Sequence, residues 1–330
     1  LNMLASDNPF DDPGLQAAWW SPEREMYFNF GEPGFQGFDP AHAFWVKSNT
    51  PLGIAWTGTG PASNSPISLP LGVGWNLIPD PFLDPVPWSL SDIKVRRAGV
   101  EKTLAEAKQA GWVEDFAWGW RKSATNPPGG SYFLVHDPSL LPTATGFLRP
   151  WNGYWISAFE ICELVIPPPA GSAAPRVSVR AKSRSSQWLA TLQADMAGAK
   201  DSVTFGGGVS SLRGPRGIKI GKPPAAPGQA PFSLFIPGDR PSQALSVDVH
   251  QGLTANDSWP LVLAGVQPNS KVALRWQDLG KAPRSLRFYL VDEVTGMRRY
   301  MRTTDSYLFT SGATGEDRRF RIEVETVGSQ

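Results

Sequence analysis

The sequence is poor in cysteine and histidine, the residues from which disulfide frameworks and zinc sites are most often built. It contains one cysteine, Cys162, which cannot form an intramolecular disulfide and leaves the redox compartment undetermined. Cys162 lies in the apolar run 161–166, which predicts a buried thiol, neither a nucleophile nor a metal ligand. The three histidines, His42, His136 and His250, are far apart and show no metal-ligand spacing. The sequence therefore predicts no zinc site.

An excess of charge and a long apolar run are also missing. The 31 basic and 30 acidic residues leave a formal charge of +1, without the basic excess that nucleic-acid binding requires. No run of about 18 apolar residues is present, so we expect no membrane span. The amino terminus lacks a basic region followed by an apolar stretch, and we expect any signal peptide to have been removed. Neither a GxSxG motif nor a phosphate-binding loop occurs, and we predict that the chain is not an enzyme.

Glycine, proline and tryptophan are abundant instead. The 33 glycines and 32 prolines make up about a fifth of the chain, which favours many short strands joined by turns. The hydrophobic content of 41% and the 14 tryptophans supply more apolar surface than a disordered chain carries. We therefore predict an all-β protein of two or more antiparallel β-sandwich-like domains with one short helix.

A proline-rich segment predicts the main domain boundary. Residues 169–175 continue the prolines at 167 and 168, and proline keeps such a segment extended and outside sheet ladders. We expect a duplicated β domain over residues 1–168, a linker over 169–175 and a β-sandwich region over 176–330. The last region is expected either to form one domain or to divide near residue 266, with a terminal immunoglobulin-like domain.

The first region contains the same pattern twice, in units of about 1–70 and 71–168. ASDNPFDDPGLQAAW (residues 5–19) matches LIPDPFLDPVPW (77–88), and the segment from residue 26 matches the segment from residue 131. In the second match, Phe44-Trp45-Val46 aligns with Tyr154-Trp155-Ile156. We expect two related halves that pack together, with Trp45 and Trp155 in the core.

The two units differ in two places. The second contains an insertion, EKTLAEAKQAG (101–111), in which Leu104, Ala107 and Lys108 share a face and Gly111 suits a helix end, so we predict the helix there. The first lacks the strand that GVGWNL (72–77) supplies to the second. We therefore expect an exposed sheet edge in the first unit, and such edges pair with other chains unless they are covered.

Short alternating runs predict strands throughout the carboxyl-terminal region. They recur about every 8 to 12 residues, as in an antiparallel sandwich. The segment Asp292–Gly296 predicts a hairpin turn. Residues 206–231, rich in glycine and proline, predict a long loop.

Two segments resemble regions of secreted bacterial proteins. GWNLIPDPF (74–82), followed by LRPWNGYWI (148–156), is similar to a GWNLIGNPF and GYW pattern of large secreted proteins, although Pro79 and Asp80 replace the usual Gly-Asn. The segment 290–324 resembles immunoglobulin-like terminal domains of exported, surface-attached proteins, including those with sorting signals. The resemblance implies an extracellular or cell-surface location and an accessory role, and it carries no catalytic residue.

Aspartates and tryptophans are the candidate binding residues. Asp7, Asp11 and Asp12 cluster in a turn whose oxygens could bind calcium, the one cofactor we consider, although aspartate beside proline is also ordinary turn chemistry. A stacking platform for sugar rings is the second candidate site. The tryptophans considered for it are Trp19, Trp20, Trp118, Trp120 and Trp151.

Three functions follow, in order of preference. The first is a non-catalytic structural or adhesive module of a bacterial surface protein, which self-assembles or joins neighbouring domains through sheet edges. The alternative is a carbohydrate-binding accessory region of a secreted enzyme, with a polysaccharide as partner. The third is a hydrolase of unfamiliar type, which requires a cleft with convergent carboxylates.

Overall fold

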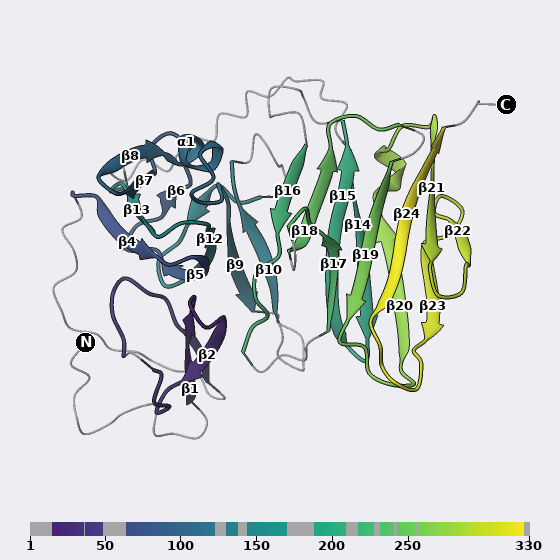
Figure 1. Cartoon of the computed structure of the whole chain (residues 1–330), viewed down its shortest axis with the longest axis horizontal. Helices are drawn as coiled ribbons and strands as arrows, with labels where there is room; N and C mark the ends of the chain where they lie inside the picture. Colours follow the sequence, from purple (N-terminus) through teal and green to yellow (C-terminus); the bar gives the residue numbers. More distant parts are fainter. Residues whose placement is uncertain are drawn as a thin grey trace. The chain divides into compact units, whose positions relative to one another are not determined.

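The computed structural model describes residues 15–35, 37–48, 64–122, 130–137, 144–169, 188–208, 217–227, 232–240, 243–254 and 257–326. The chain divides into two compact units, Leu1–Ala181 and Lys182–Gln330 (Figure 1). Both are built almost entirely from antiparallel strands, so the predicted all-β class is confirmed. Most of the predicted linker, from residue 170 onward, lies outside the described residues.

Unit 1 contains three sheets of three or four strands and one short strand pair. Sheet A has the order β2 (Met26–Asn29), β1 (Leu15–Ser21), β3 (Trp45–Ser48). Sheet B has the order β10 (Gly130–Val135), β9 (Ala117–Lys122), β12 (Gly153–Ala158), β5 (Gly74–Pro79). Sheet C has the order β4 (Ile67–Leu71), β13 (Cys162–Ile166), β7 (Lys94–Arg97), β8 (Val100–Thr103), and the pair joins β11 (Phe147–Leu148) to β6 (Val86–Pro87).

Sheet A has the same strand order as three strands of sheet B. In the sequence alignment β2 and β3 correspond to β10 and β12. The sheet orders β2-β1-β3 and β10-β9-β12 place β1 in the position of β9, although the alignment matches Trp19 of β1 with Trp88. The register agrees as well, because Trp20 lies opposite Tyr27 in sheet A and Trp120 lies opposite Tyr132 in sheet B. The two sheets therefore share one three-strand arrangement.

The two sheets contact each other through equivalent tryptophans. The rings of Trp20 in sheet A and Trp155 in sheet B meet edge to face, with their centroids 5.2 Å apart. Trp120 in sheet B and Trp45 in sheet A occupy the equivalent positions and also meet edge to face, with their centroids 5.4 Å apart. Trp155 is buried, as expected, whereas Trp45 is partly buried. Edge-to-face pairs of this kind add about 0.5–1.5 kcal/mol beyond the area they bury.

Sheets B and C enclose the main core of unit 1, which includes Tyr154, Ile156 and Leu164. The helix α1 (Leu104–Gln109) covers part of this core with Leu104 and Ala107, and a capping box of Thr103 and Glu106 begins it. The predicted helix is therefore confirmed.

The predicted burial of Cys162 is also confirmed, since the residue is 5% exposed. Burial raises the pKa of the Cys162 thiol to about 11. The thiol therefore stays protonated at neutral pH, which is the inert form.

Unit 2 is one continuous sheet that curls around one core. Its order is β22 (Arg298–Tyr300), β21 (Leu286–Asp292), β24 (Arg318–Thr326), β19 (Ser258–Ala264), β17 (Ser233–Pro237), β18 (Ala244–His250), β15 (Ala199–Gly207), β14 (Trp188–Met196), β20 (Lys271–Gln277), β23 (Ser306–Thr310), with β16 (Ile218–Gly221) beside β18. A short 3-10 helix, η2 (Leu279–Lys281), follows β20. The pair β15–β18 is parallel, whereas the other pairs between described strands are antiparallel.

Of the two arrangements expected for this region, the structure has one compact unit, and the expected long loop needs correction. A division near residue 266 does not occur in the described residues, because β19 pairs with β24, β14 pairs with β20, and one core contains residues from both sides. The long loop predicted over 206–231 contains β16, whose four residues pair with β18. The predicted hairpin is present, with Gly296 at φ +69° and its N–H bonded to Asp292.

Candidate functional site

The second edge of β3 is open in the described part of the chain, whereas the equivalent edge of β12 is filled by β5. Along an antiparallel strand, the backbone groups of successive residues point alternately to one neighbouring strand and to the other. The carbonyl of Ala17 accepts a hydrogen bond from the backbone N–H of Phe30, the residue after β2, so the backbone groups of Ala17 point toward β2. Ala17 lies opposite Val46, so the backbone groups of Val46 point away from β1, toward the open edge. Val46 is 48% exposed, whereas its counterpart Ile156 is fully buried.

A tryptophan near this edge lacks the hydrogen bond that its counterpart makes. The indole N–H of Trp20 donates to the carbonyl of Trp75 in β5 at 2.8 Å. Trp120 is the equivalent residue of sheet B, and within the described residues its indole N–H makes no hydrogen bond. The carbonyl that it would bind by analogy belongs to a fourth strand, which sheet A does not have in the part of the chain that the structure describes.

No protein-family model matches the sequence, and searches of curated proteins and of solved structures found no significant similarity to it.

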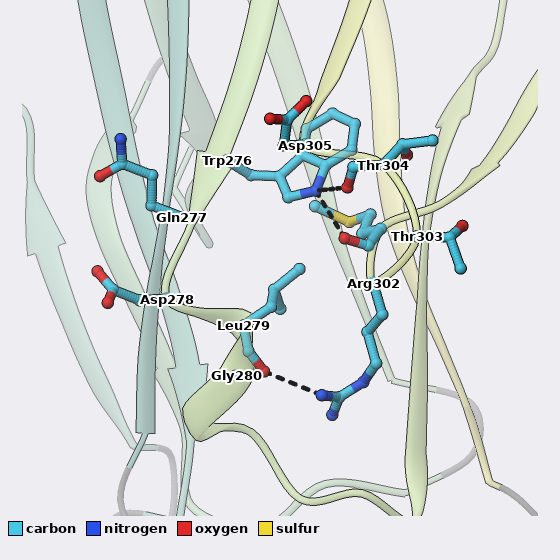
Figure 2. Close-up of a pocket in the computed structure, with 10 residues that line it drawn as sticks. Trp276, Gln277, Asp278, Leu279, Gly280, Arg302, Thr303, Thr304 and Asp305 are labelled. Atoms are coloured by element: carbon cyan, nitrogen blue, oxygen red, sulfur yellow. Dashed lines mark hydrogen bonds between the residues drawn. The ribbon is translucent and has the colours of Figure 1, made fainter.

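A shallow pocket of about 480 Å³ lies between the end of β20 and the turn before β23 (Figure 2). The indole N–H of Trp276 donates to the carbonyls of Met301 and Thr304, each at 2.8 Å. The guanidinium of Arg302 donates to the carbonyls of Leu279, Ala282 and Pro283. Asp278 on the rim pairs with Lys281 at 3.2 Å. Trp276 and Arg302 therefore hold β20 and the turn after it against the turn before β23.

His250 lies between two carboxylates at one end of the unit 2 core. Its Nε2 is 3.5 Å from Asp248 and its Nδ1 is 3.6 Å from Asp257, while its ring stacks on Trp259 at 4.7 Å. A register shift in the β16–β18 pairing lies two residues before Asp248. We did not predict this cluster, although the alternation of Asp248 and His250 in β18 was a signal for it.

Metal binding finds no support in these clusters. Among the residues that the structure describes, no group of three or more histidine, cysteine, aspartate or glutamate side chains could hold a metal ion. Asp7, Asp11 and Asp12 lie outside the described residues, so the calcium site stays a prediction. No helix in the described part is long and apolar enough to cross a membrane.

The five tryptophans of the predicted sugar platform lie in different environments. Trp19, Trp20 and Trp118 are buried, with exposures of 7%, 8% and 8%, and Trp120 is partly buried against Trp45 and Tyr132. Trp151 is 81% exposed. Sugar binding stays a prediction, and Trp151 is the one of the five whose ring is largely open to solvent.

Asp80, the counterpart of the aspartates near the amino terminus, is buried in the loop after β5. Its Oδ1 accepts a hydrogen bond from the backbone N–H of Phe82 at 3.0 Å, while its Oδ2 is buried and has no partner among the described residues. Burial, with a smaller contribution from the charge of Asp84, raises the pKa of Asp80 to about 6. At neutral pH the fold therefore holds a carboxylate that it would accommodate better protonated.

The substitution Asp80→Asn is expected to stabilise the protein at pH 7.5 and to leave its stability nearly unchanged at pH 4. A raised folded-state pKa gives stability that is complete below the unfolded value of about 3.9 and is lost as pH rises through about 6. The asparagine keeps the bond to Phe82 and removes the buried charge, for a gain of up to about 3 kcal/mol. Thermal denaturation at both pH values measures this gain, with Glu23→Gln at an exposed position as the control. An equal gain at both pH values would contradict the charge argument.

Proposed function

We propose that the chain is a non-catalytic structural or adhesive module of a bacterial surface protein, which joins other chains or neighbouring repeats by strand addition at β3. The observation that carries the proposal is the difference between two equivalent sheets, one with a fourth strand and one without it among the described residues. The backbone groups of Val46 face the open position, as those of Ile156 face β5. The extracellular location is part of the proposal and rests on the resemblance of GWNLIPDPF and LRPWNGYWI to secreted proteins.

The expected partner is an extended segment similar to β5. In sheet B, β12 binds β5 antiparallel, with Trp155 opposite Leu77 and Ile156 opposite Asn76. A strand added to β3 in the same register places a leucine-like residue opposite Trp45. One of its backbone carbonyls then accepts a hydrogen bond from the indole N–H of Trp120. Backbone bonds supply the affinity of such strand addition, and alternate side chains supply the register.

The β5 strand of unit 1 is not itself available as a donor. The buried side chain of Asn76 accepts a hydrogen bond from the N–H of Gly72 and donates to the carbonyls of Gly72 and Gly74. The carbonyls of Trp75 and Leu77 accept bonds from Trp20 and Ala43 of the first half. The added strand therefore comes from another segment of similar sequence.

A labelled peptide of residues 72–82 (GVGWNLIPDPF) is expected to bind the whole protein, and fluorescence polarisation measures it. Val46→Pro is expected to weaken binding at least about tenfold, because proline removes a donor that faces the open edge and leaves the ladder to β1 in place. Leu308→Pro is the matched control, since Leu308 is 70% exposed on β23, which ends the strand order of the unit 2 sheet. A scrambled peptide is the second control.

Two results would contradict the proposal. One is a peptide that does not bind at any accessible concentration, and the other is equal binding by wild type and Val46→Pro. Loss of binding in both proline variants would point to general unfolding, which circular dichroism of each variant distinguishes.

A further inference from the structure

Two neighbouring loops at one end of sheet B carry strongly exposed apolar side chains. The loop after β5 presents Leu83, which is 77% exposed, and the turn before β12 presents Trp151, which is 81% exposed. The backbone N–H of Asp80 donates to the carbonyl of Asn152, which places the two loops side by side. Trp151 and Leu83 have the highest exposed fractions among the large apolar side chains that the structure describes.

The backbone at Trp151 shows that the fold does not favour a tryptophan there. Trp151 has φ +63°, and the N–H of Asn152 bonds back to the carbonyl of Arg149, so the turn places Pro150 second and Trp151 third. In such a turn the third position favours glycine or asparagine, because a bulky side chain is strained at positive φ. The strained turn is held in place by the hydroxyl of Tyr154, which accepts the N–H of Arg149 at 2.7 Å. Tryptophan therefore adds strain and little packing, and its indole is best explained by a partner.

The surrounding groups favour a sugar ring as that partner. Arg149 is exposed in the same turn, and Asp84 is exposed in the neighbouring loop beside Leu83. An indole face covers the apolar face of a pyranose, while a guanidinium and a carboxylate supply donors and acceptors for its hydroxyls. Insertion into a lipid surface would instead bury Leu83 together with the charge of Asp84, which is costly.

We propose that Trp151, with Arg149 and Asp84 beside it, forms a stacking site for a neutral hexopyranose chain of an extracellular polysaccharide. The balanced charge of Arg149 and Asp84 fits a neutral sugar better than an acidic one. The projecting position of Trp151 suits the side of a polysaccharide chain, which a single exposed ring reaches without a cleft. The site lies on a different sheet from β3 and is independent of strand addition there.

Retention of the whole protein on insoluble cellulose, chitin, mannan, β-1,3-glucan and starch tests the proposal. Wild type is expected to bind at least one of these, and Trp151→Asn is expected to bind it at least about tenfold more weakly. The same variant is expected to melt higher by roughly 2–4 °C, because asparagine relieves the strained turn. Loss of binding with a gain in stability is a result that a merely structural tryptophan would not give.

The matched control is Ile161→Asn, which replaces a side chain that is 75% exposed at another turn and is expected to leave retention unchanged. Two results overturn the proposal. One is that the wild type binds none of the five polysaccharides, and the other is that wild type and Trp151→Asn bind equally. Binding of wild type to phosphatidylcholine–phosphatidylglycerol vesicles that is lost in Trp151→Asn, without polysaccharide binding, overturns it in favour of a lipid surface. Peptide binding at β3 is unaffected by these outcomes, so the two proposals fail separately.

Discussion

Replacing Asp292 by alanine is expected to destabilise unit 2 by about 3–5 kcal/mol, because it leaves the guanidinium of Arg318 buried without its partner. Asp292 is 1% exposed at the end of β21. Its carboxylate accepts bonds from Arg318 of β24, from the hydroxyl of Tyr307 of β23 at 2.8 Å and from the N–H of Val294 at 3.1 Å. One side chain therefore ties three strands and the hairpin turn together.

Denaturant unfolding at pH 7 and pH 3 measures this effect and its pH dependence. Burial alone would raise the pKa of Asp292, but the hydrogen bonds from Arg318 and Tyr307 hold it below its ordinary value. A lowered pKa gives stability that is present above the unfolded value of about 3.9 and is lost as pH falls through the folded value. The difference between wild type and Asp292→Ala should therefore shrink in acid.

The exposed pair of Arg298 and Glu325 provides the control for Asp292. Its side chains are 39% and 45% exposed, so Glu325→Ala is expected to cost no more than about 1 kcal/mol. Equal costs for Asp292→Ala and Glu325→Ala would show that burial of the ion pair is not what matters.

Trp259→Ala is expected to cost unit 2 about 3–5 kcal/mol through the cavity it leaves. Trp259 is fully buried in β19, and its ring meets those of Phe205 at 5.1 Å and His250 at 4.7 Å. Its indole N–H also donates to the carbonyl of Asp248 at 3.1 Å. Trp259→Phe keeps most of the buried area and loses this bond, so we expect a smaller cost of about 1–2 kcal/mol.

Hydrogen exchange of the whole protein shows which unit each tryptophan supports. Trp259→Ala should lower amide protection within 188–326 and leave peptides of unit 1 unchanged. Trp155→Ala, at an equally buried position of unit 1, is the reciprocal control. Loss of protection in both units from either substitution would show that the two units do not unfold separately.

Local structure was predictable from the sequence wherever a short motif determines it. The helix follows from Thr103 and Glu106, whose spacing is that of a capping box, and from Gly111, which takes φ +73° after its end. The hairpin after β21 follows from Gly296 in the same way. In each case the bonds close within a few residues, so no distant part of the chain is needed.

The partners of each face were less predictable. The spacing of Trp118 and Trp120 correctly predicts that the two rings share a face of one strand, but it does not say what covers that face. In the structure Trp120 packs against Trp45, which lies 75 positions earlier. The burial of Trp19, Trp20 and Trp118 depends on such distant contacts, and so do β16 and the pairing across residue 266.

The open edge of β3 could be predicted in part. Comparison of the two units predicts from sequence alone that one strand is unmatched, because the chain contains both copies of the pattern. The sequence does not show which backbone groups point toward the vacant position, since that depends on the register of β1 with its two neighbours. Val46 and Trp120 could therefore be identified only from the pairing.

The position of β24 determines the order in which unit 2 can be completed during synthesis. Figure 1 shows this strand between β19 and β21, and it pairs with both along most of its length. A nascent chain therefore carries β19 and β21 with unmatched edges until residue 326 has left the ribosome. During that interval these two edges are open to pairing with other chains.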